Sequence, residues 1–299
     1  MKLYDFDGMF DEKLSAYISK NIGKYKESEW EDIIPQMYSK FGDTVIKPLG
    51  VTPNGYYRSL SSEDLVKSLC LHIKKGVPVS EFLCRAIEER PECVPMLLPL
   101  LKGEDGVKQY AVNILGGNVQ AVPQYMEILT SDADEDFKNQ CLDYIKEQAD
   151  AVKDIAVSNY KKGVEKELML EILARVTLKS DEVFDILLNE FRCSDDVQLF
   201  AGYLASYGDE RALPYLLEKI DEEGISYPEF QELKYAIEAL GGEYDKQRDF
   251  TGDEYYDLIH SSQNVSDVDI FSAFNSQEQP YEPSSESPSE EPSPADNEE

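Results

Sequence analysis

Residues 110–117, YAVNILGG, return 125 residues later as residues 235–242, YAIEALGG. Both stretches follow the pattern Tyr-Ala-aliphatic-x-x-Leu-Gly-Gly, and their offset corresponds to about four units of roughly 31 residues. A second pair supports this length, because Gly117 followed by 121–123 (AVP) matches Gly208 followed by 212–214 (ALP), an offset of 91 residues. We infer an internal repeat of about 31 residues.

Each repeat has the pattern of two short helices. From residue 61 to residue 242, apolar residues fall at positions i, i+1, i+4 and i+5 in segments that end at Gly, Pro, Asp or Ser. A helix pair of this size cannot bury its apolar face alone, so neighbouring pairs must stack into one core. The sequence therefore predicts an all-α fold, an elongated and curved α-solenoid of antiparallel helix pairs. The expected starts of successive first helices are Pro91, Ala121, Val152, Asp181 and Glu210.

One stretch links this pattern to a known family. Residues 208–217, GDERALPYLL, resemble the Gly-Asp-x-x-Ala-hydrophobic-Pro-x-Leu opening of HEAT repeats, in the short bacterial variety often labelled phycobilisome-lyase-type. The resemblance covers roughly residues 61–242. It implies a superhelix whose second helices line a concave face, and it says little about function because such repeats serve many partners.

The composition divides the chain into three parts. Residues 1–60 contain two further helical patterns, 10–22 and 30–41, and we expect them to form an N-terminal helical cap. We expect the second of these helices to be capped by Ser28 with Glu31, and residues 53–55 to form a turn. The solenoid follows at residues 61–244. Residues 245–299 are predicted to be an acidic disordered tail, because residues 250–299 hold thirteen acidic side chains and no Lys or Arg. Within the tail, one short apolar island is formed by Val265, Val268, Ile270, Phe271 and Phe274.

Charge restricts the partners. The formal net charge is −31, from 60 acidic and 29 basic side chains, so nucleic acid and anionic membranes would be repelled. We expect a protein or peptide partner, including a basic one. The sequence contains neither a signal-peptide pattern nor an apolar run long enough to span a membrane. The five cysteines are odd in number, are widely spaced without a CxxC pair, and lie among apolar residues. This pattern favours reduced core thiols in a cytoplasmic protein.

Three constellations resemble catalytic or metal sites. Residues 5–8, DFDG, resemble the first motif of haloacid-dehalogenase-type phosphatases, but no buried strand precedes Asp5. Asp132, Asp134 and Asp136 have calcium-loop spacing without the Gly and Glu that such a loop needs, which favours helix capping. His72 and His260 are the only histidines, and His72 is interpreted as a core or boundary residue. We therefore expect neither catalysis nor a cofactor nor a metal site, and a phosphatase remains the remote alternative.

What remains is a binding surface. We expect a non-catalytic scaffold or adaptor that holds a protein or peptide on the concave face, or alternatively an acidic chaperone or nucleic-acid mimic that binds basic proteins by charge. The predicted partner-binding residues are the non-core positions of the second helices, namely Asn113, Asn139, Glu171, Arg175, Tyr203, Lys234 and Glu238.

Overall fold

The computed structural model describes residues 1–262, and this part of the chain contains helices and no strand. The predicted all-α class is confirmed. The helices are α1 (Phe6–Lys20), α2 (Glu27–Gly42), α3 (Pro53–Arg58), α4 (Ser62–Lys74), α5 (Glu81–Glu88), α6 (Val94–Leu97), α7 (Asp105–Leu115), α8 (Val122–Leu129), α9 (Glu135–Lys146), α10 (Ala149–Lys162), α11 (Lys166–Leu173), α12 (Asp181–Cys193), α13 (Val197–Tyr207), α14 (Leu213–Ile220), α15 (Tyr227–Ala239) and α16 (Glu254–Ser262), with 3-10 turns at Pro91–Cys93, Leu98–Lys102 and Glu210–Ala212.

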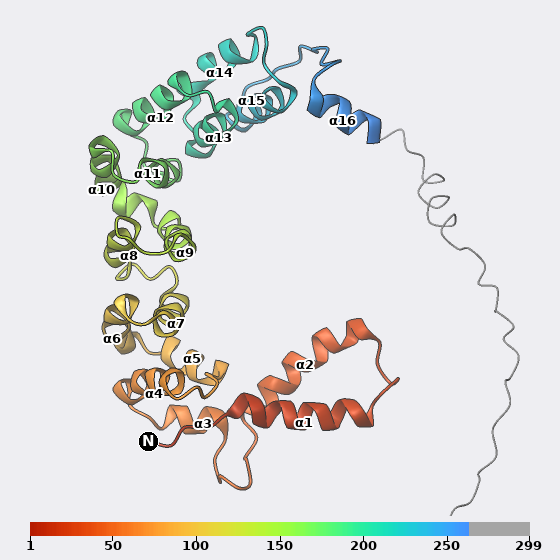
Figure 1. Ribbon diagram of the computed structural model, residues 1–299, viewed down its shortest axis with the longest axis vertical. Coiled ribbons are helices and arrows are strands. Elements are labelled where there is room, and N and C mark those ends of the chain that lie inside the picture. The colour runs from red at the N-terminus through yellow and green to blue at the C-terminus, as the bar shows by residue number, and fades with distance from the viewer. Residues whose placement is uncertain (263–299) are drawn as a thin grey trace, which may run out of the picture.

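From α4 to α15 the helices form a curved row of antiparallel pairs (Figure 1). The first helix of each pair, from α6 to α14, lies on the outer side of the arc, and the second, from α7 to α15, lies on the inner side. Contacts along the inner side join α9 to α11, α11 to α13 and α13 to α15. The inner helices therefore form a continuous concave layer.

The repeat boundaries follow the local sequence. Asp181 begins α12 as expected, whereas Pro91 and Glu210 begin the 3-10 turns that lead into α6 and α14. Helix α8 begins one residue after Ala121, and α10 begins at Ala149, three residues before Val152. Both copies of the Gly-Gly pattern end an inner helix, with Gly116 at φ +47° and Gly241 at φ +81°. A left-handed φ is readily adopted only by glycine, which explains why the repeated stretch ends as it does.

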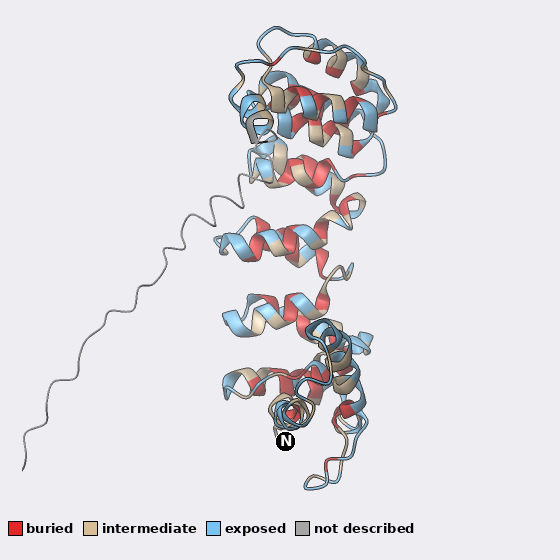
Figure 2. Ribbon diagram, turned by 90° about the vertical axis from the view of Figure 1, so that its right-hand side faces the viewer, coloured by how far each residue is buried: buried red, intermediate tan, exposed pale blue. Residues whose placement is uncertain are grey.

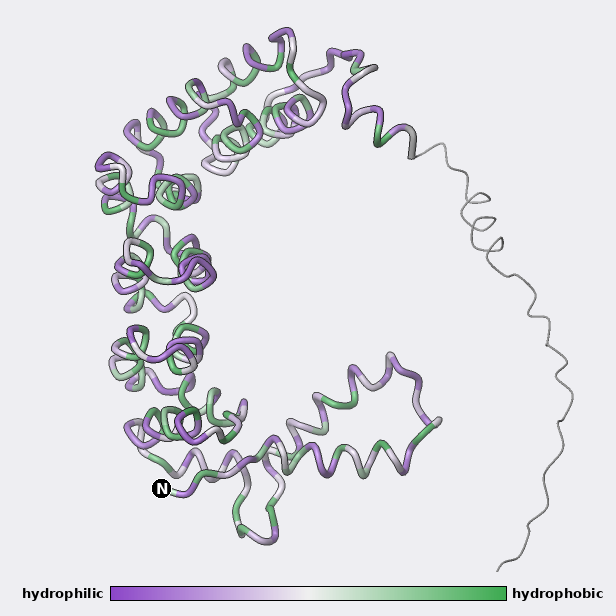
Figure 3. Tube along the Cα trace, viewed as in Figure 1, coloured by the Kyte–Doolittle hydropathy of each residue, from purple (hydrophilic) through white to green (hydrophobic). Residues whose placement is uncertain are grey.

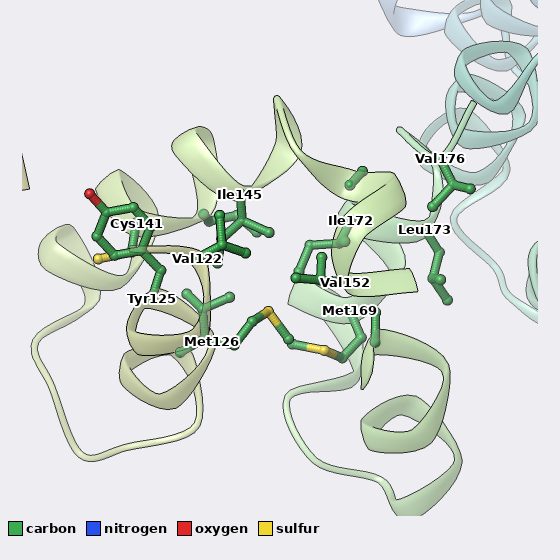
Figure 4. Packing of buried hydrophobic residues seen from close by; sticks show 14 of the residues in the cluster. Val122, Tyr125, Met126, Cys141, Ile145, Val152, Met169, Ile172, Leu173 and Val176 are labelled. Carbon is green, nitrogen blue, oxygen red and sulfur yellow. The ribbon is translucent and has the colours of Figure 1, made fainter. Parts of the chain in front are cut away.

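The core runs from one pair to the next. Buried residues lie along the facing sides of the helices in every layer of the row (Figure 2). Where the α8/α9 and α10/α11 pairs meet, Met126 and Val152 lie close to Met169 and Ile172 (Figure 4). Tyr125 and Cys141 pack together between α8 and α9. Each pair therefore shares its apolar surface with its neighbours, as its short helices require.

The N-terminal segment is a projecting hairpin. Phe6, Phe10 and Phe41 are buried at its base, and Tyr38 stacks on Phe82 of α5 with ring centroids 4.5 Å apart. Beyond this base, α1 and α2 extend away from the row on its open side (Figure 1). Their surface alternates between polar and apolar residues up to the turn (Figure 3).

Two expectations for this segment are wrong. Helix α2 is capped at Lys26, whose backbone N–H donates to Glu29 at 2.6 Å, and not at Ser28 with Glu31. Only half of a capping box forms there, because the Lys26 ammonium cannot accept a hydrogen bond from the Glu29 N–H. Residues 53–55 begin helix α3 in place of a turn, because the Thr52 hydroxyl accepts from the Gly55 N–H at 2.9 Å and Pro53 suits the first helical position.

The C-terminal part of the row extends past residue 244. Phe250 is buried, and its ring lies 5.0 Å from that of Phe230 in α15. The Asp253 carboxylate accepts from the backbone N–H of Tyr227 at 2.9 Å. The predicted tail boundary at residue 245 therefore precedes residues that pack on α15, whereas the rest of the predicted disordered tail and its apolar island lie outside the described residues.

Candidate functional site

The seven predicted partner-binding residues lie in or next to inner helices. Asn113 is in α7, Asn139 in α9, Glu171 in α11 and Tyr203 in α13, while Arg175 follows the end of α11. Lys234 and Glu238 are in α15. Figure 1 places these helices on the concave side of the arc.

Three of these residues meet in one cavity. Glu171, Arg175 and Tyr203 line a hollow of about 290 Å³ that spans helices α9 to α15. The other lining residues are Lys146, Ala174, Gln198, Leu199, Gly202, Ser206 and Glu232. A cavity of this size is at or below the roughly 300–1,000 Å³ typical of sites that enclose a small molecule, so it suits a side chain presented by a larger partner.

The floor of the cavity is helix α13, which has an unusual sequence. Residues 197–207, VQLFAGYLASY, contain no charged side chain, although charged residues make up 30% of the chain. On this helix Leu199 is 42% exposed, and on the neighbouring α15 Tyr235 is 63% exposed. Leu199 and Tyr203, which both line the cavity, thus form an apolar and aromatic strip in the C-terminal half of the row.

Charges surround this strip. Lys146 forms ion pairs with Glu171 at 3.3 Å and with Asp143 at 2.9 Å. Burial lowers the pKa of Lys146, but these two carboxylates outweigh it, and the pKa is raised above its usual value. Arg175 is exposed at the rim. The lining of the cavity thus combines the ion-paired ammonium of Lys146 with the side chains of Arg175 and Glu232.

Tyr203 presents a neutral hydroxyl to the cavity. Burial, and to a smaller extent the charges of Glu171 and Glu167, raise the pKa of Tyr203 to about 12. The ring packs edge-on against Phe200 with centroids 5.6 Å apart. The phenol is therefore held in place and stays protonated at neutral pH, so it can donate or accept a hydrogen bond.

The other predicted residues lie outside the cavity. The Asn113 side chain accepts from Gln140 at 2.5 Å, and Gln140 also accepts from Gln109 at 2.6 Å. These amides link α7 to α9. Asn139 is exposed on α9.

Lys234 and Glu238 belong to the end of the row. Lys234 lines a separate hollow of about 410 Å³ together with Lys246 and Arg248. The Lys234 ammonium lies 3.9 Å from the Glu238 carboxylate, four residues later in α15. The predicted residues thus divide between two hollows, and Asn113, Asn139 and Glu238 line neither of them.

Sequence reasoning missed Lys146, Leu199 and Glu232, which line the cavity. A signal existed for Leu199, because the eleven residues of α13 form an uncharged run in a highly charged chain. Lys146 and Glu232 carried no comparable signal. They join the cavity only because neighbouring repeats stack in register.

The catalytic and metal-like constellations have structural roles here. Asp5 is the N-cap of α1 and accepts from the Gly8 N–H at 2.8 Å, while Asp7 accepts from the Tyr38 hydroxyl at 2.6 Å. Asp134 caps α9, as predicted, by accepting from the Phe137 N–H at 2.9 Å. His72 is buried, also as predicted, with Nδ1 2.7 Å from the Pro78 carbonyl oxygen. Within residues 1–262, no group of three His, Cys, Asp or Glu side chains is arranged to hold a metal ion.

The cysteines are only partly core residues. All five thiols are free, and Cys93 and Cys141 are buried as predicted, whereas Cys70 and Cys84 are half-buried and Cys193 is exposed. Burial raises the pKa of both the Cys84 and the Cys141 thiols to about 12. Cys193 is the last residue of α12, and the buried residues of this helix end at Phe191. Among the described helices, none is both long and apolar enough to cross a bilayer.

Comparison with known proteins gives no relative. No protein-family model, no curated protein and no solved structure matches this chain.

Proposed function

We propose that the chain is an α-solenoid of the HEAT type and that it works as a binding module. In this proposal the concave layer, from α7 to α15, holds a segment of another protein. The repeated YAxxxLGG pattern and the arrangement of helix pairs in a curved row support the solenoid. The partner is a protein or peptide of the cytoplasm.

The observation that carries the proposal is the uncharged surface of α13. Leu199 and Tyr203 present apolar and aromatic surface inside a concavity, and Arg175 lies next to them. Aromatic and arginine side chains in a partly desolvated depression are the residue types that dominate protein interfaces. A purely solvated face would not need an eleven-residue helix without charge.

The spacing of the inner helices favours an extended segment as the ligand. Packed helices lie about 8–10 Å apart, and an extended chain rises about 3.3 Å per residue. Each inner helix could therefore contact about three residues of the ligand. A segment that crosses α9 to α15 would place one side chain in the cavity of about 290 Å³ beside Tyr203.

A peptide-display selection against the full chain tests this proposal. Leu199→Asp puts a charge into the strip, and Ile155→Asp makes the same change at a residue of similar exposure on outer helix α10, 49% against 42%. We expect selected peptides to lose binding to Leu199→Asp and to keep it with Ile155→Asp. Equal binding to both variants and the parent would refute the concave site.

A second candidate is supported by the charge distribution. Residues 104–299 carry 45 acidic and 15 basic side chains, whereas residues 1–103 carry 15 and 14. An acidic chaperone or nucleic-acid mimic would use this field to bind basic proteins. Its affinity would fall steeply between low salt and 0.5 M salt and would be insensitive to Leu199→Asp, which separates it from the groove mechanism.

A further inference from the structure

The hollow of about 410 Å³ at the C-terminal end of the row has a basic lining in an acidic chain. It is lined by Lys234, Lys246 and Arg248 and by a single carboxylate, that of Asp245. The cavity of about 290 Å³ beside Tyr203, in contrast, is lined by two cations and two carboxylates. We call these two sites the basic hollow and the Tyr203 cavity. An anionic group would meet net positive charge in the basic hollow, although the whole chain carries a net charge of −31.

One wall of the basic hollow is a strap, which we define as residues 243–253. The Tyr244 hydroxyl donates to the Asp221 carboxylate at 2.7 Å, just after the end of α14. The Asp253 carboxylate accepts from the Tyr227 N–H at 2.9 Å, at the start of α15. The strap is therefore anchored near both of its ends. A wall that is fixed before a ligand arrives lowers the entropy that binding must remove.

Two of the cations hold the strap in place. The Arg248 guanidinium donates to the backbone carbonyl oxygens of Ile220 and Glu222, which are neutral acceptors at the end of α14. The Lys246 ammonium lies 2.5 Å from the Asp221 carboxylate. Both residues therefore connect the strap to α14, in addition to the positive charge that they bring to the hollow.

The charge of Lys234 is less committed. Its ammonium lies 3.9 Å from the Glu238 carboxylate, and the two side chains are 41% and 56% exposed. A lysine that precedes its glutamate by four residues is in the less favourable order for an ion pair on a helix. Exposed pairs of this kind contribute little to stability. A carboxylate that enters the hollow can therefore compete with Glu238 for the Lys234 ammonium.

The neutral groups of the lining also suit a carboxylate. Gln231 and Gln247 carry amide N–H donors, and an ionised carboxylate accepts hydrogen bonds at both of its oxygens. The rings of Phe230 and Phe250, whose centroids are 5.0 Å apart, make another part of the lining apolar. Apolar walls lower the local dielectric constant, which strengthens the attraction between a bound carboxylate and the cations.

Helix α15 separates the basic hollow from the Tyr203 cavity. Glu232 lines the cavity and Lys234 lines the hollow. Two positions correspond to about 200° around a helix of 3.6 residues per turn, so these side chains lie on opposite sides of α15. Tyr235 comes between them on the helix surface and is 63% exposed. The two sites therefore flank a helix that presents an exposed aromatic side chain.

The width of α15 fits a short stretch of extended ligand. A helix with its side chains is about 10 Å wide, and an extended chain rises about 3.3 Å per residue. We propose that the segment held by the concave layer carries an acidic residue about three residues from its apolar anchor. The acidic side chain enters the basic hollow beside Lys234, and the apolar one occupies the Tyr203 cavity. This inference rests on the proposed function and adds the sequence class of the ligand.

A display selection with random-sequence peptides, run in parallel on the full chain and on its Lys234→Glu variant, tests the inference. Peptides selected on the parent should carry Asp or Glu about three residues from Leu, Ile or Phe. Peptides selected on Lys234→Glu should carry Lys or Arg at that position instead. Lys161→Glu is the matched control, because it makes the same change on outer helix α10 at a lysine that also pairs with a carboxylate, that of Glu182. Its peptides should match those of the parent.

A synthetic peptide from the parent selection measures the size of the effect. Its affinity should fall about tenfold with Lys234→Glu and by less with Lys234→Gln, which removes the charge without reversing it. Both losses should shrink in about 0.5 M salt. Replacement of the acidic residue of the peptide by its amide should weaken binding to the parent and leave binding to Lys234→Gln nearly unchanged.

The possible results separate this inference from the proposed function. Peptides that lose binding to Leu199→Asp but show no acidic preference, or keep that preference on Lys234→Glu, would overturn the basic hollow as a subsite and leave the concave site in place. A parent selection that yields no peptide dependent on Leu199, or only basic peptides bound by the overall negative charge, would overturn both.

Discussion

Lys138 is buried although its side chain is charged. Its ammonium lies 3.1 Å from the Glu165 carboxylate at the start of α11 and 3.3 Å from Glu135 in its own helix. Lys108 makes the equivalent contacts one repeat earlier, with Asp134 at 3.0 Å and Asp105 at 2.9 Å. The cation thus bridges one inner helix to the first residues of the next, and its aliphatic stem fills the space between them.

Replacing Lys138 separates packing from charge. Lys138→Ala removes both the stem and the ion pairs and should lower the free energy of unfolding by about 2 kcal/mol. Lys138→Met keeps the stem and should recover at least half of the loss. Urea denaturation of the two variants measures the difference. If Met were as damaging as Ala, the charge and not the packing would be the main contribution.

At the scale of helices, Asp150 connects α10 to the segment after α11. Its carboxylate accepts from the backbone N–H groups of Thr177 at 2.8 Å and Leu178 at 3.0 Å, and from the Thr177 hydroxyl. These hydrogen bonds hold the pKa of Asp150 below its usual value, and the one from the Leu178 N–H contributes most. A lowered pKa in the folded state means that the contact stabilises the fold above the unfolded-state pKa of about 4 and is lost as pH falls below it.

Asp150→Asn therefore has a pH-dependent effect. At pH 7 the variant should unfold at lower urea concentration than the parent, because a neutral amide is a weaker acceptor. The difference should be constant above about pH 4 and shrink below it, since the folded-state pKa of Asp150 is lowered and the parent carboxylate becomes protonated only there. Urea midpoints at several pH values check this, and a difference that stays constant below about pH 4 as well would mean that the Asp150 charge does not contribute.

Much of the helical arrangement could be predicted from the sequence. Glycines that end the repeated YAxxxLGG stretches, and apolar residues at helical spacing, predicted the positions of the outer helices to within three residues. The capping of α2 was misplaced because both Ser28 and Lys26 precede a glutamate by three residues, and only backbone geometry selects between them. The start of α3 was missed because a Thr-Pro-Asn-Gly sequence suits a helix start as well as a turn.

The candidate site was only partly predictable. Periodicity identified Glu171 and Tyr203 as surface positions of inner helices, and the cavity contains both. It could not show that Lys146 and Glu232, which lie 86 residues apart, line the same hollow. That proximity depends on how successive helix pairs rotate against each other, which the pattern of one repeat does not encode.

At the scale of the whole molecule, contacts join each helix pair mainly to its neighbours. Stability in such a row is the sum of local terms, so damage at one point need not spread along the chain. Leu204→Ala opens a cavity at a buried position of α13 and should cost about 2–5 kcal/mol locally.

Hydrogen–deuterium exchange can follow this variant along the chain. We expect faster exchange from α11 to α15 and unchanged exchange from α4 to α7. Ile87→Ala, at a buried position of α5, should produce the reverse distribution. A uniform increase over all helices in both variants would show that the row unfolds as one cooperative unit.

The most direct measurement for the account as a whole is site-specific photo-cross-linking in extracts of cells that make the protein. A photoreactive phenylalanine analogue replaces Leu199 on the concave side or, as the matched control, Ile155 on the outer layer. We predict a discrete protein adduct at position 199 that disappears when Tyr203→Ala is added, and no adduct at position 155. Adducts of equal yield at the two positions, or adducts at 199 that ignore Tyr203→Ala, would contradict a binding groove on the concave face.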